Sequence, residues 1–213
     1  MPINRKSYRE LAPRLREGAC LAGTFVKTPT PHATEILGLL GFDFVVFDME
    51  HAAIDLGSLD RMILGARAAN VAAVVRVPEG NPPAILSALD LGATGILVPH
   101  VSSRAIAQTI VASCRYKDGK RGFANTTRAG NYGLTGFEAH KASQDHETAC
   151  IAMIEDLEAV AIIDDILSVP GLDAVFIGRG DLTAALGCKA MNDPRQWKSC
   201  VPSWRRRNAT SCR

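Results

Sequence analysis

Long apolar segments are missing from this sequence of 213 residues. No run approaches the roughly 18 apolar residues that a helix needs to span a bilayer. The first residues, MPINRKSYRELAPRLREG, lack the apolar core of a secretory signal peptide and have the pattern of an amphipathic helix instead. These absences predict a cytoplasmic protein with no membrane partner.

Two common kinds of cofactor motif are also absent. The six cysteines include no pair at Cys-x-x-Cys spacing, so reduced thiols are expected and a zinc site is not. No Gly-x-Gly-x-x-Gly motif follows the first predicted strand, which disfavours dinucleotide binding.

Excess positive charge is confined to the end of the chain. Residues 1–187 hold 17 Lys and Arg against 21 Asp and Glu, whereas residues 188–213 hold 7 against 1. The body therefore has no charge pattern for nucleic-acid binding. The triple arginine of the tail is compatible with nucleic acid or an acidic surface, but we expect a disordered or non-native end.

The body alternates short β-rich runs with helical patterns. The predicted helices are 32–41, 56–70, 82–92, 102–115, 136–146 and 157–169. The predicted strands are 21–27, 42–48, 72–78, 95–100, 121–124, 150–156 and 172–178. Most of these strands are continuously apolar, which is typical of parallel strands buried on both faces. The pattern favours a (β/α)₈ barrel or a doubly wound sheet.

Polar residues follow several of these apolar runs. In a β/α barrel such residues project from the carboxyl ends of the strands into one mouth. They are Asp48, Glu50 and His51, then Arg76, then Glu155 and Asp156, and finally Arg179 and Asp181.

These residue types predict a specific chemistry. Glu155 and Asp181 are suited to a hard divalent cation, which would act as a Lewis acid on a 2-oxo acid and stabilise its enolate. Arg76 offers a fork for a carboxylate. His51 can move a proton near neutral pH, and Asp48 could orient it.

Each residue also has a purely structural interpretation. Asp48 could cap a turn, Arg76 could pair with a surface acid, and Asp181 could cap the helix that follows it. Glu50 could hydrogen-bond a metal-bound water or only cap the turn. Lys27 is the one candidate for a Schiff base, and we consider that chemistry less favoured.

Several motifs taken together resemble the HpcH/HpaI aldolase family, over roughly residues 10–187. They are VVFDMEH, VVRVP, GATGILVPHV, KDGKRGFA, AMIEDLEAV and LDAVFIGRGDLTAALG. The resemblance implies a TIM barrel of the phosphoenolpyruvate/pyruvate type and a metal-dependent class II aldolase of the 4-hydroxy-2-oxoheptanedioate type. Such an enzyme cleaves a 4-hydroxy-2-oxo acid to pyruvate and an aldehyde, and the family is typically hexameric.

The resemblance also implies roles for individual residues. Glu155 and Asp181 would bind Mg²⁺, or Mn²⁺ or Co²⁺, and His51 would be the acid/base, supported by Asp48. Arg76 would bind the pyruvyl carboxylate and polarise the keto oxygen. The implied substrate-binding backbone is at Gly178, Gly180 and Asp181, and the residue implied to reach a neighbouring subunit's site is Asp90.

The sequence departs from the family pattern at three places. Met153 stands where Gln is frequent, and Arg179 where Pro is frequent. The family also continues for roughly fifty residues where this chain has its atypical tail. We therefore predict a barrel domain of seven strands over residues 1–187, with strand and helix eight missing and a frameshift near residue 188.

Two other functions stay open at this point. One is a CoA-ester lyase of the citrate-lyase β-like type, for which Arg121 and Arg128 are weak candidates for a CoA-binding patch. The other is an inactive truncated remnant.

Overall fold

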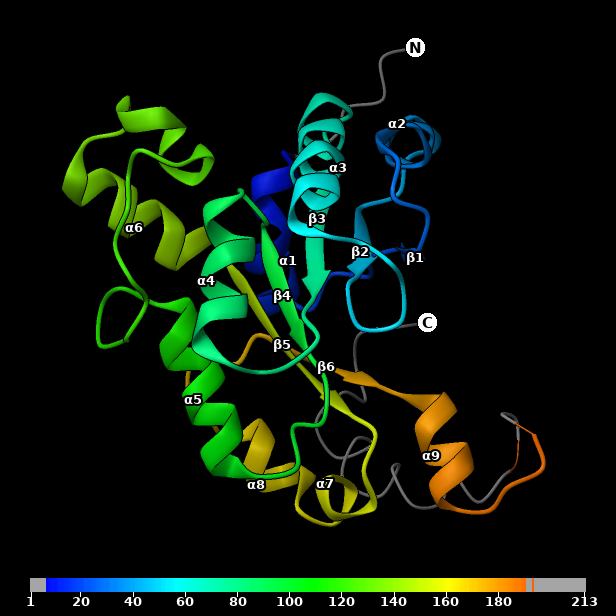
Figure 1. The fold of residues 1–213 in the computed structure, drawn as a ribbon. Helices are drawn as coiled ribbons and strands as arrows, with labels where there is room; N and C mark the ends of the chain where they lie inside the picture. Colours follow the sequence, from blue (N-terminus) through cyan, green and yellow to red (C-terminus); the bar gives the residue numbers. More distant parts are fainter. Residues whose placement is uncertain (1–6, 191–192, 194–213) are drawn as a thin grey trace.

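The computed structural model describes residues 7–190 and 193, and Figure 1 shows strands and helices alternating along them. The strands are β1 Gly23–Val26, β2 Phe44–Asp48, β3 Ala72–Arg76, β4 Gly95–Val98, β5 Ala149–Ile154 and β6 Ala174–Ile177. The helices are η1 Tyr8–Glu10, α1 Leu11–Arg16, α2 Pro31–Leu40, α3 Leu56–Ala68, α4 Pro82–Asp90, α5 Arg104–Cys114, η2 Arg128–Gly133, α6 Phe137–Glu147, α7 Leu157–Ala161, α8 Ile163–Leu167 and α9 Arg179–Ala185.

The six strands form one parallel sheet in the order β1-β2-β3-β4-β5-β6. The sheet is curled. This is shown by the first and last strands, where Phe25 on β1 and Phe176 on β6 meet edge to face with ring centroids 5.6 Å apart. Within the described residues the two edge strands are not hydrogen-bonded to each other. The architecture is therefore a curled half-barrel with helices, consistent with a partial TIM-type barrel.

Alternating side chains on each strand enter two separate apolar clusters. Val45, Phe47 and Val75 belong to the larger cluster, which includes residues of the surrounding helices. Val46 and Val74 belong to the smaller cluster on the inner side of the curl, because successive strand residues point to opposite faces. This double burial explains why the strands read as continuous apolar runs.

Helix α1 covers one end of the smaller apolar cluster, on the inner side of the curl. Leu11 and Ala12 are buried against the inner cluster, which includes Ala72 and Ala149, the first residues of β3 and β5. The amino ends of the strands are therefore covered. The N-terminal amphipathic helix predicted from the sequence is confirmed as η1 and α1.

The predicted strand at 121–124 is wrong, so the described sheet has six strands where the sequence predicted seven. Backbone N–H groups of this loop bond locally, Lys120 to the Ala112 carbonyl and Arg121 to the Arg115 carbonyl. The Arg121 guanidinium is buried over the Tyr116 ring, 4.6 Å from its centroid. This segment is therefore a loop, held by local backbone hydrogen bonds and by the buried guanidinium of Arg121, and not a strand of the sheet.

The other predicted strands and helices are present, with two changes near the end. The helix predicted over 157–169 is divided into α7 and α8, because Ile162 takes a non-helical conformation and packs against the core. Asp181 does not cap the last helix. That helix begins at Arg179 after Gly178, and Asp181 lies within its first turn.

The predicted tail, 188–213, lies largely outside the described residues, which include only 188–190 and 193 of it. The domain boundary at 187 and the frameshift therefore stay predictions. None of the helices in the described part of the chain has the length and apolarity that a membrane span requires.

Candidate active site

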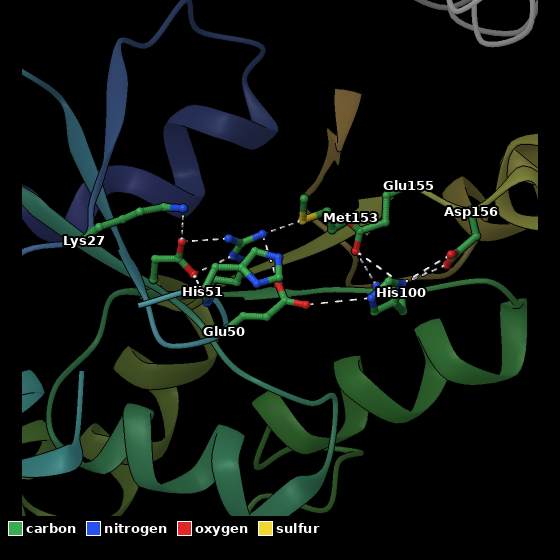
Figure 2. Close-up of polar contacts among 9 residues, drawn as sticks. Lys27, Glu50, His51, His100, Met153, Glu155 and Asp156 are labelled. Atoms are coloured by element: carbon green, nitrogen blue, oxygen red, sulfur yellow. Dashed lines mark hydrogen bonds and ion pairs between the residues drawn. The ribbon is translucent and has the colours of Figure 1, made fainter. Parts of the chain in front are cut away.

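Four strands carry a charged side chain at their carboxyl ends, on the inner side of the curl. Each charged residue follows an inward-facing apolar residue by two positions, so the pleat turns it the same way. The four are Lys27 after Phe25, Asp48 after Val46, Arg76 after Val74 and Glu155 after Met153. Figure 2 shows Lys27 and Glu155 near opposite ends of one chain of polar contacts.

Asp48 and Arg76 form a buried bidentate ion pair. The register of β2 with β3 places them directly opposite each other. Arg76 Nε donates to Asp48 Oδ1 at 2.9 Å and Nη2 donates to Oδ2 at 2.7 Å. Lys27 Nζ is 3.2 Å from Asp48 Oδ2, and the Arg76 guanidinium lies over the Phe25 ring, 5.1 Å from its centroid.

The environment of Asp48 favours its ionised form. Burial opposes ionisation, but the hydrogen bonds from the Arg76 side chain and the His51 backbone outweigh it, and the pKa of Asp48 falls to about 2. The carboxylate is therefore a fixed negative charge that holds the guanidinium in place.

This geometry changes the predicted roles of Arg76 and His51. The fork of Arg76 is occupied by Asp48, and only Nη1 is left, 3.0 Å from Glu50 Oε2 and 3.8 Å from Met153 Sδ. Asp48 Oδ1 accepts the backbone N–H of His51 at 3.0 Å, not its ring. The ring of His51 is 54% exposed, and its Nε2 is 3.8 Å from Glu50 Oε2. Glu50 is thus the carboxylate beside the imidazole.

Glu155 is buried at the end of β5 and is held by the loop after β4. Its Oε1 accepts the backbone N–H of His100 at 2.9 Å. The His100 ring lies among three carboxylates, 3.6 Å from Glu155, 3.7 Å from Glu50 and 3.3 Å from Asp156 (Figure 2). His100 therefore connects the end of β4 with β2 and β5.

Negative charge accumulates around Glu155. Burial raises the pKa of Glu155, and the neighbouring Asp181 and Glu50 carboxylates raise it further, whereas the His100 N–H opposes the change. Asp181 is exposed in the first turn of α9, and its charge is among the causes that raise the pKa of Glu155. That the two residues bind one metal stays a prediction.

Gly178 leaves the space that the Glu155 carboxylate uses. A Cβ at Gly178 would lie 2.6 Å from Glu155 Cβ, 2.7 Å from Glu155 Oε2 and 2.9 Å from Met153 Cε. A Cβ at Gly180 would meet nothing within 4 Å. Gly178 is buried and Gly180 is exposed, so of the two predicted glycines only Gly178 shapes the site around Glu155.

We expect Gly178→Ala to lower the free energy of unfolding by about 1–3 kcal/mol, because the added methyl group overpacks the Glu155 side chain. Urea denaturation followed by circular dichroism measures this change. Gly180→Ala is the matched control and should stay within about 0.5 kcal/mol of the parent. Equal effects of the two substitutions would contradict the packing argument.

Asp90 lies apart from these residues, at the last position of α4. Its Oδ1 is 3.8 Å from Arg121 Nη2, and burial raises its pKa while Arg121 opposes the increase. Among the described residues, no hydrogen bond or ion pair joins Asp90 to the charged residues at the strand ends. Its role in a neighbouring subunit stays a prediction.

The candidate CoA-binding arginines are engaged within the chain. Arg128 donates to the carbonyls of Asp60 and Leu91 and pairs with the Asp60 carboxylate at 2.8 Å. Arg121 is fully buried and donates to Gln144 Oε1 at 3.3 Å. Neither guanidinium forms an open basic patch.

The donor atoms at this site fit a hard divalent cation. Among the described residues no group of three or more His, Cys, Asp or Glu is placed so that it could hold a metal ion. Two carboxylates with the remaining positions taken by water or substrate are nonetheless typical of Mg²⁺. The feature that fits a cation there is the buried Glu155 carboxylate, whose pKa is raised by burial and by the charges of Asp181 and Glu50.

Sequence reasoning missed one residue and left another uncertain. His100 was not among the candidates, although it is the last residue of the predicted strand 95–100. In the structure it lies two residues beyond the end of β4. Glu50 was left between a functional and a capping role, and the structure shows it in contact with Arg76 and beside the rings of His51 and His100. A search of every strand end for ionisable residues could have found His100.

A curled parallel sheet with charged side chains gathered at the carboxyl ends of its strands defines a β/α-barrel type of active site. The profile of the HpcH/HpaI aldolase/citrate lyase family matches residues 21–198, and the chain belongs to this family. The resemblance seen in the sequence is thereby confirmed at the family level. The match continues to residue 198, beyond the predicted boundary at 187.

Characterised relatives in this family include aldolases. A hydroxypyruvate/pyruvate aldolase of Rhizorhabdus wittichii is 38% identical over 83% of this chain and 68% of its own length. A 2-dehydro-3,6-dideoxy-6-sulfogluconate aldolase of Pseudomonas putida is 33% identical over 81% and 68%. The crystal structure of a family protein from Burkholderia cenocepacia J2315 superposes with a TM-score of 0.83 at 30% identity, over 90% of this chain and 77% of that one.

Proposed function

We propose that this protein is a divalent-metal-dependent aldolase that cleaves a 4-hydroxy-2-oxo acid to pyruvate and an aldehyde. The observation that carries the proposal is the buried Glu155 carboxylate, which has other carboxylates around it and accepts the His100 N–H. Glu50 connects this group, through the His100 ring, to Arg76 and to the exposed ring of His51. The aldolase activities of two relatives support the reaction class.

Glu155 and Asp181 would hold the cation, which we propose to be Mg²⁺, Mn²⁺ or Co²⁺. When bound, the cation supplies Lewis-acid polarisation of the 2-oxo group. Gly178 leaves room for the Glu155 carboxylate beside it, and the backbone from Gly178 to Asp181, at the start of α9, would bind the substrate carboxylate.

The reaction breaks the C3–C4 bond of the substrate. The proton of the 4-hydroxyl group leaves to a base, C4 becomes the aldehyde carbonyl, and the electron pair moves to C3 and the 2-oxo oxygen. Protonation at C3 then gives the methyl group of pyruvate. The His51 ring, exposed at the end of β2, is the group suited to accept and return the proton.

Arg76 would stabilise the negative charge that develops on the substrate. Because Asp48 occupies Nε and Nη2, a substrate oxygen would approach Nη1, in place of its weak contact with Met153 Sδ at 3.8 Å and beside Glu50 Oε2 at 3.0 Å. A donor held rigidly before the reaction begins does not have to reorganise as charge develops. The ion pair with Asp48 thus prepares Arg76 for this role.

Exchange of the methyl protons of pyruvate in D₂O, followed by ¹H NMR, tests the proposal without knowledge of the aldehyde. We expect exchange with Mg²⁺, Mn²⁺ or Co²⁺, and its loss on addition of EDTA, because forming the enolate is the shared half of the reaction. Folded protein that exchanges no protons with any of the three metals would contradict the proposal.

The same preparation can be assayed with 4-hydroxy-2-oxoheptanedioate and with malyl-CoA. Cleavage of the first and not of the second supports the aldolase, whereas the reverse would establish a CoA-ester lyase. The burial of Arg121 and Arg128 favours the first result.

A further inference from the structure

His100 has an unusual backbone for a residue with a side chain. Its φ is +53°, in the left-handed region, where a Cβ crowds the following carbonyl oxygen. Histidine is among the residues that tolerate this region better than most. A conformation of this kind persists only where the surrounding structure maintains it, and such residues cluster at functional sites.

The left-handed turn directs two successive N–H groups toward β5. The Val101 N–H donates to the Met153 carbonyl at 3.3 Å, which extends the backbone pairing of β4 with β5. The His100 N–H donates to the carboxylate of Glu155 at 2.9 Å. The backbone of the loop therefore fixes one carboxylate oxygen, Oε1, while Oε2 lies against Gly178.

The imidazole of His100 makes weaker contacts than its main chain. The side chain is 60% exposed, and the ring nitrogens are 3.3–3.7 Å from the nearest oxygens of Asp156, Glu155 and Glu50. Contacts of this length at an exposed group are strongly screened by solvent. The short hydrogen bond to Glu155 comes from the main chain.

We propose that His100 is a positioning residue whose left-handed main chain, not its imidazole, fixes the orientation of the Glu155 carboxylate. This inference rests on the proposed role of Glu155 in binding a metal. Groups that orient a ligand are expected to change metal affinity by about 10- to 100-fold when they are lost.

Binding of Mn²⁺, measured by electron paramagnetic resonance of the free ion, separates the main chain from the ring. His100→Gly and His100→Asn keep the N–H and accept a positive φ, so we expect Kd values within about threefold of the parent. His100→Val disfavours the left-handed region, so we expect Kd to rise about tenfold or more. Asp118→Val is the matched control, because Asp118 has φ +56° and lies exposed in another loop.

Two results would overturn the proposal. Equal Mn²⁺ affinity of His100→Val and the parent would show that the backbone does not position Glu155. Loss of affinity in His100→Gly and His100→Asn as large as in His100→Val would assign the effect to the imidazole. Complete absence of Mn²⁺ binding by the parent would instead refute the proposed function.

A measurement without metal tests the hydrogen bond directly. The chain has five histidines, so protein labelled with ¹⁵N-histidine gives few amide signals, and the His100 signal is the one missing from His100→Asn. Glu155→Ala removes the acceptor, and we expect the His100 amide proton to move upfield by more than any other histidine amide. An unchanged His100 amide would overturn the proposal whether or not the protein binds metal.

Discussion

Asp48→Ala is expected to lower the free energy of unfolding by about 3–5 kcal/mol, because it leaves a buried cation without its main partner. The side chain of Arg76 is only 5% exposed, and two of the three nitrogens of its guanidinium donate to Asp48. Glu50 and the Phe25 ring remain near it but cannot replace the bidentate pair. Urea denaturation at pH 7 measures the loss.

The pH dependence of this loss follows from the pKa of Asp48. Folding lowers that pKa from 3.8 to about 2, so the ionised carboxylate stabilises the fold above its unfolded pKa and this stability is lost as the pH falls through the folded pKa. The shift corresponds to roughly 2 kcal/mol. The difference in stability between the parent and Asp48→Ala should therefore become smaller below about pH 4.

Two further variants make this prediction specific to the pair. Asp164→Ala removes an exposed aspartate of α8 and should change stability by no more than about 0.5 kcal/mol. Asp48→Ala combined with Arg76→Met should recover part of the loss, because apolar replacement of a buried ion pair is frequently close to neutral. A loss below about 1 kcal/mol for Asp48→Ala alone would contradict the buried-pair argument.

The sequence predicted the strands of this fold well because they are buried on both faces and therefore apolar throughout. It could not predict how the fork of Arg76 is used. That depends on the register of β2 with β3, which places Asp48 directly opposite Arg76. The sequence pattern identified both residues as functional candidates but left their mutual contact unstated, so Arg76 was expected to offer a whole fork to a substrate.

The errors of the sequence prediction have related physical causes. The apolar residues of 121–124 suggested a strand, but a buried Arg121 and local backbone bonds determine the loop there. His100 was not predicted because its shortest hydrogen bond is donated by the main chain, and a positive φ is not visible in a side-chain motif. Tertiary pairing and backbone conformation, not residue type, decided these cases.

Glu155→Gln is expected to remove function and to raise the stability of the metal-free protein. Several kcal/mol of Lewis-acid stabilisation would be lost with the cation, so pyruvate methyl-proton exchange should fall by a factor on the order of a thousand. Glutamine has the same shape and keeps an oxygen that can accept the His100 N–H. The substitution therefore removes the charge and leaves the packing in place.

The sign of the stability change follows from the direction of the pKa shift. Burial raises the pKa of Glu155 above its ordinary value of 4.5, so the folded protein holds the proton more tightly than the unfolded chain. The parent thus loses stability as the pH rises through this range, whereas Glu155→Gln does not. The variant should be the more stable protein at pH 8, by urea denaturation in EDTA.

Addition of Mn²⁺ should reverse this order. A ligand at a hundred times its Kd stabilises the folded parent by about 2.7 kcal/mol and leaves a variant that cannot bind it unchanged. Glu158→Gln, at an exposed position of α7, is the matched control and should follow the parent under both conditions. A Glu155→Gln variant that is less stable than the parent in EDTA and retains exchange would contradict both the burial argument and the metal-binding role. A buried, carboxylate-rich cation site requires that Glu155→Gln be the more stable protein in EDTA and the parent the more stable in Mn²⁺. The reason is that the charge of Glu155 destabilises the metal-free fold and also binds the metal.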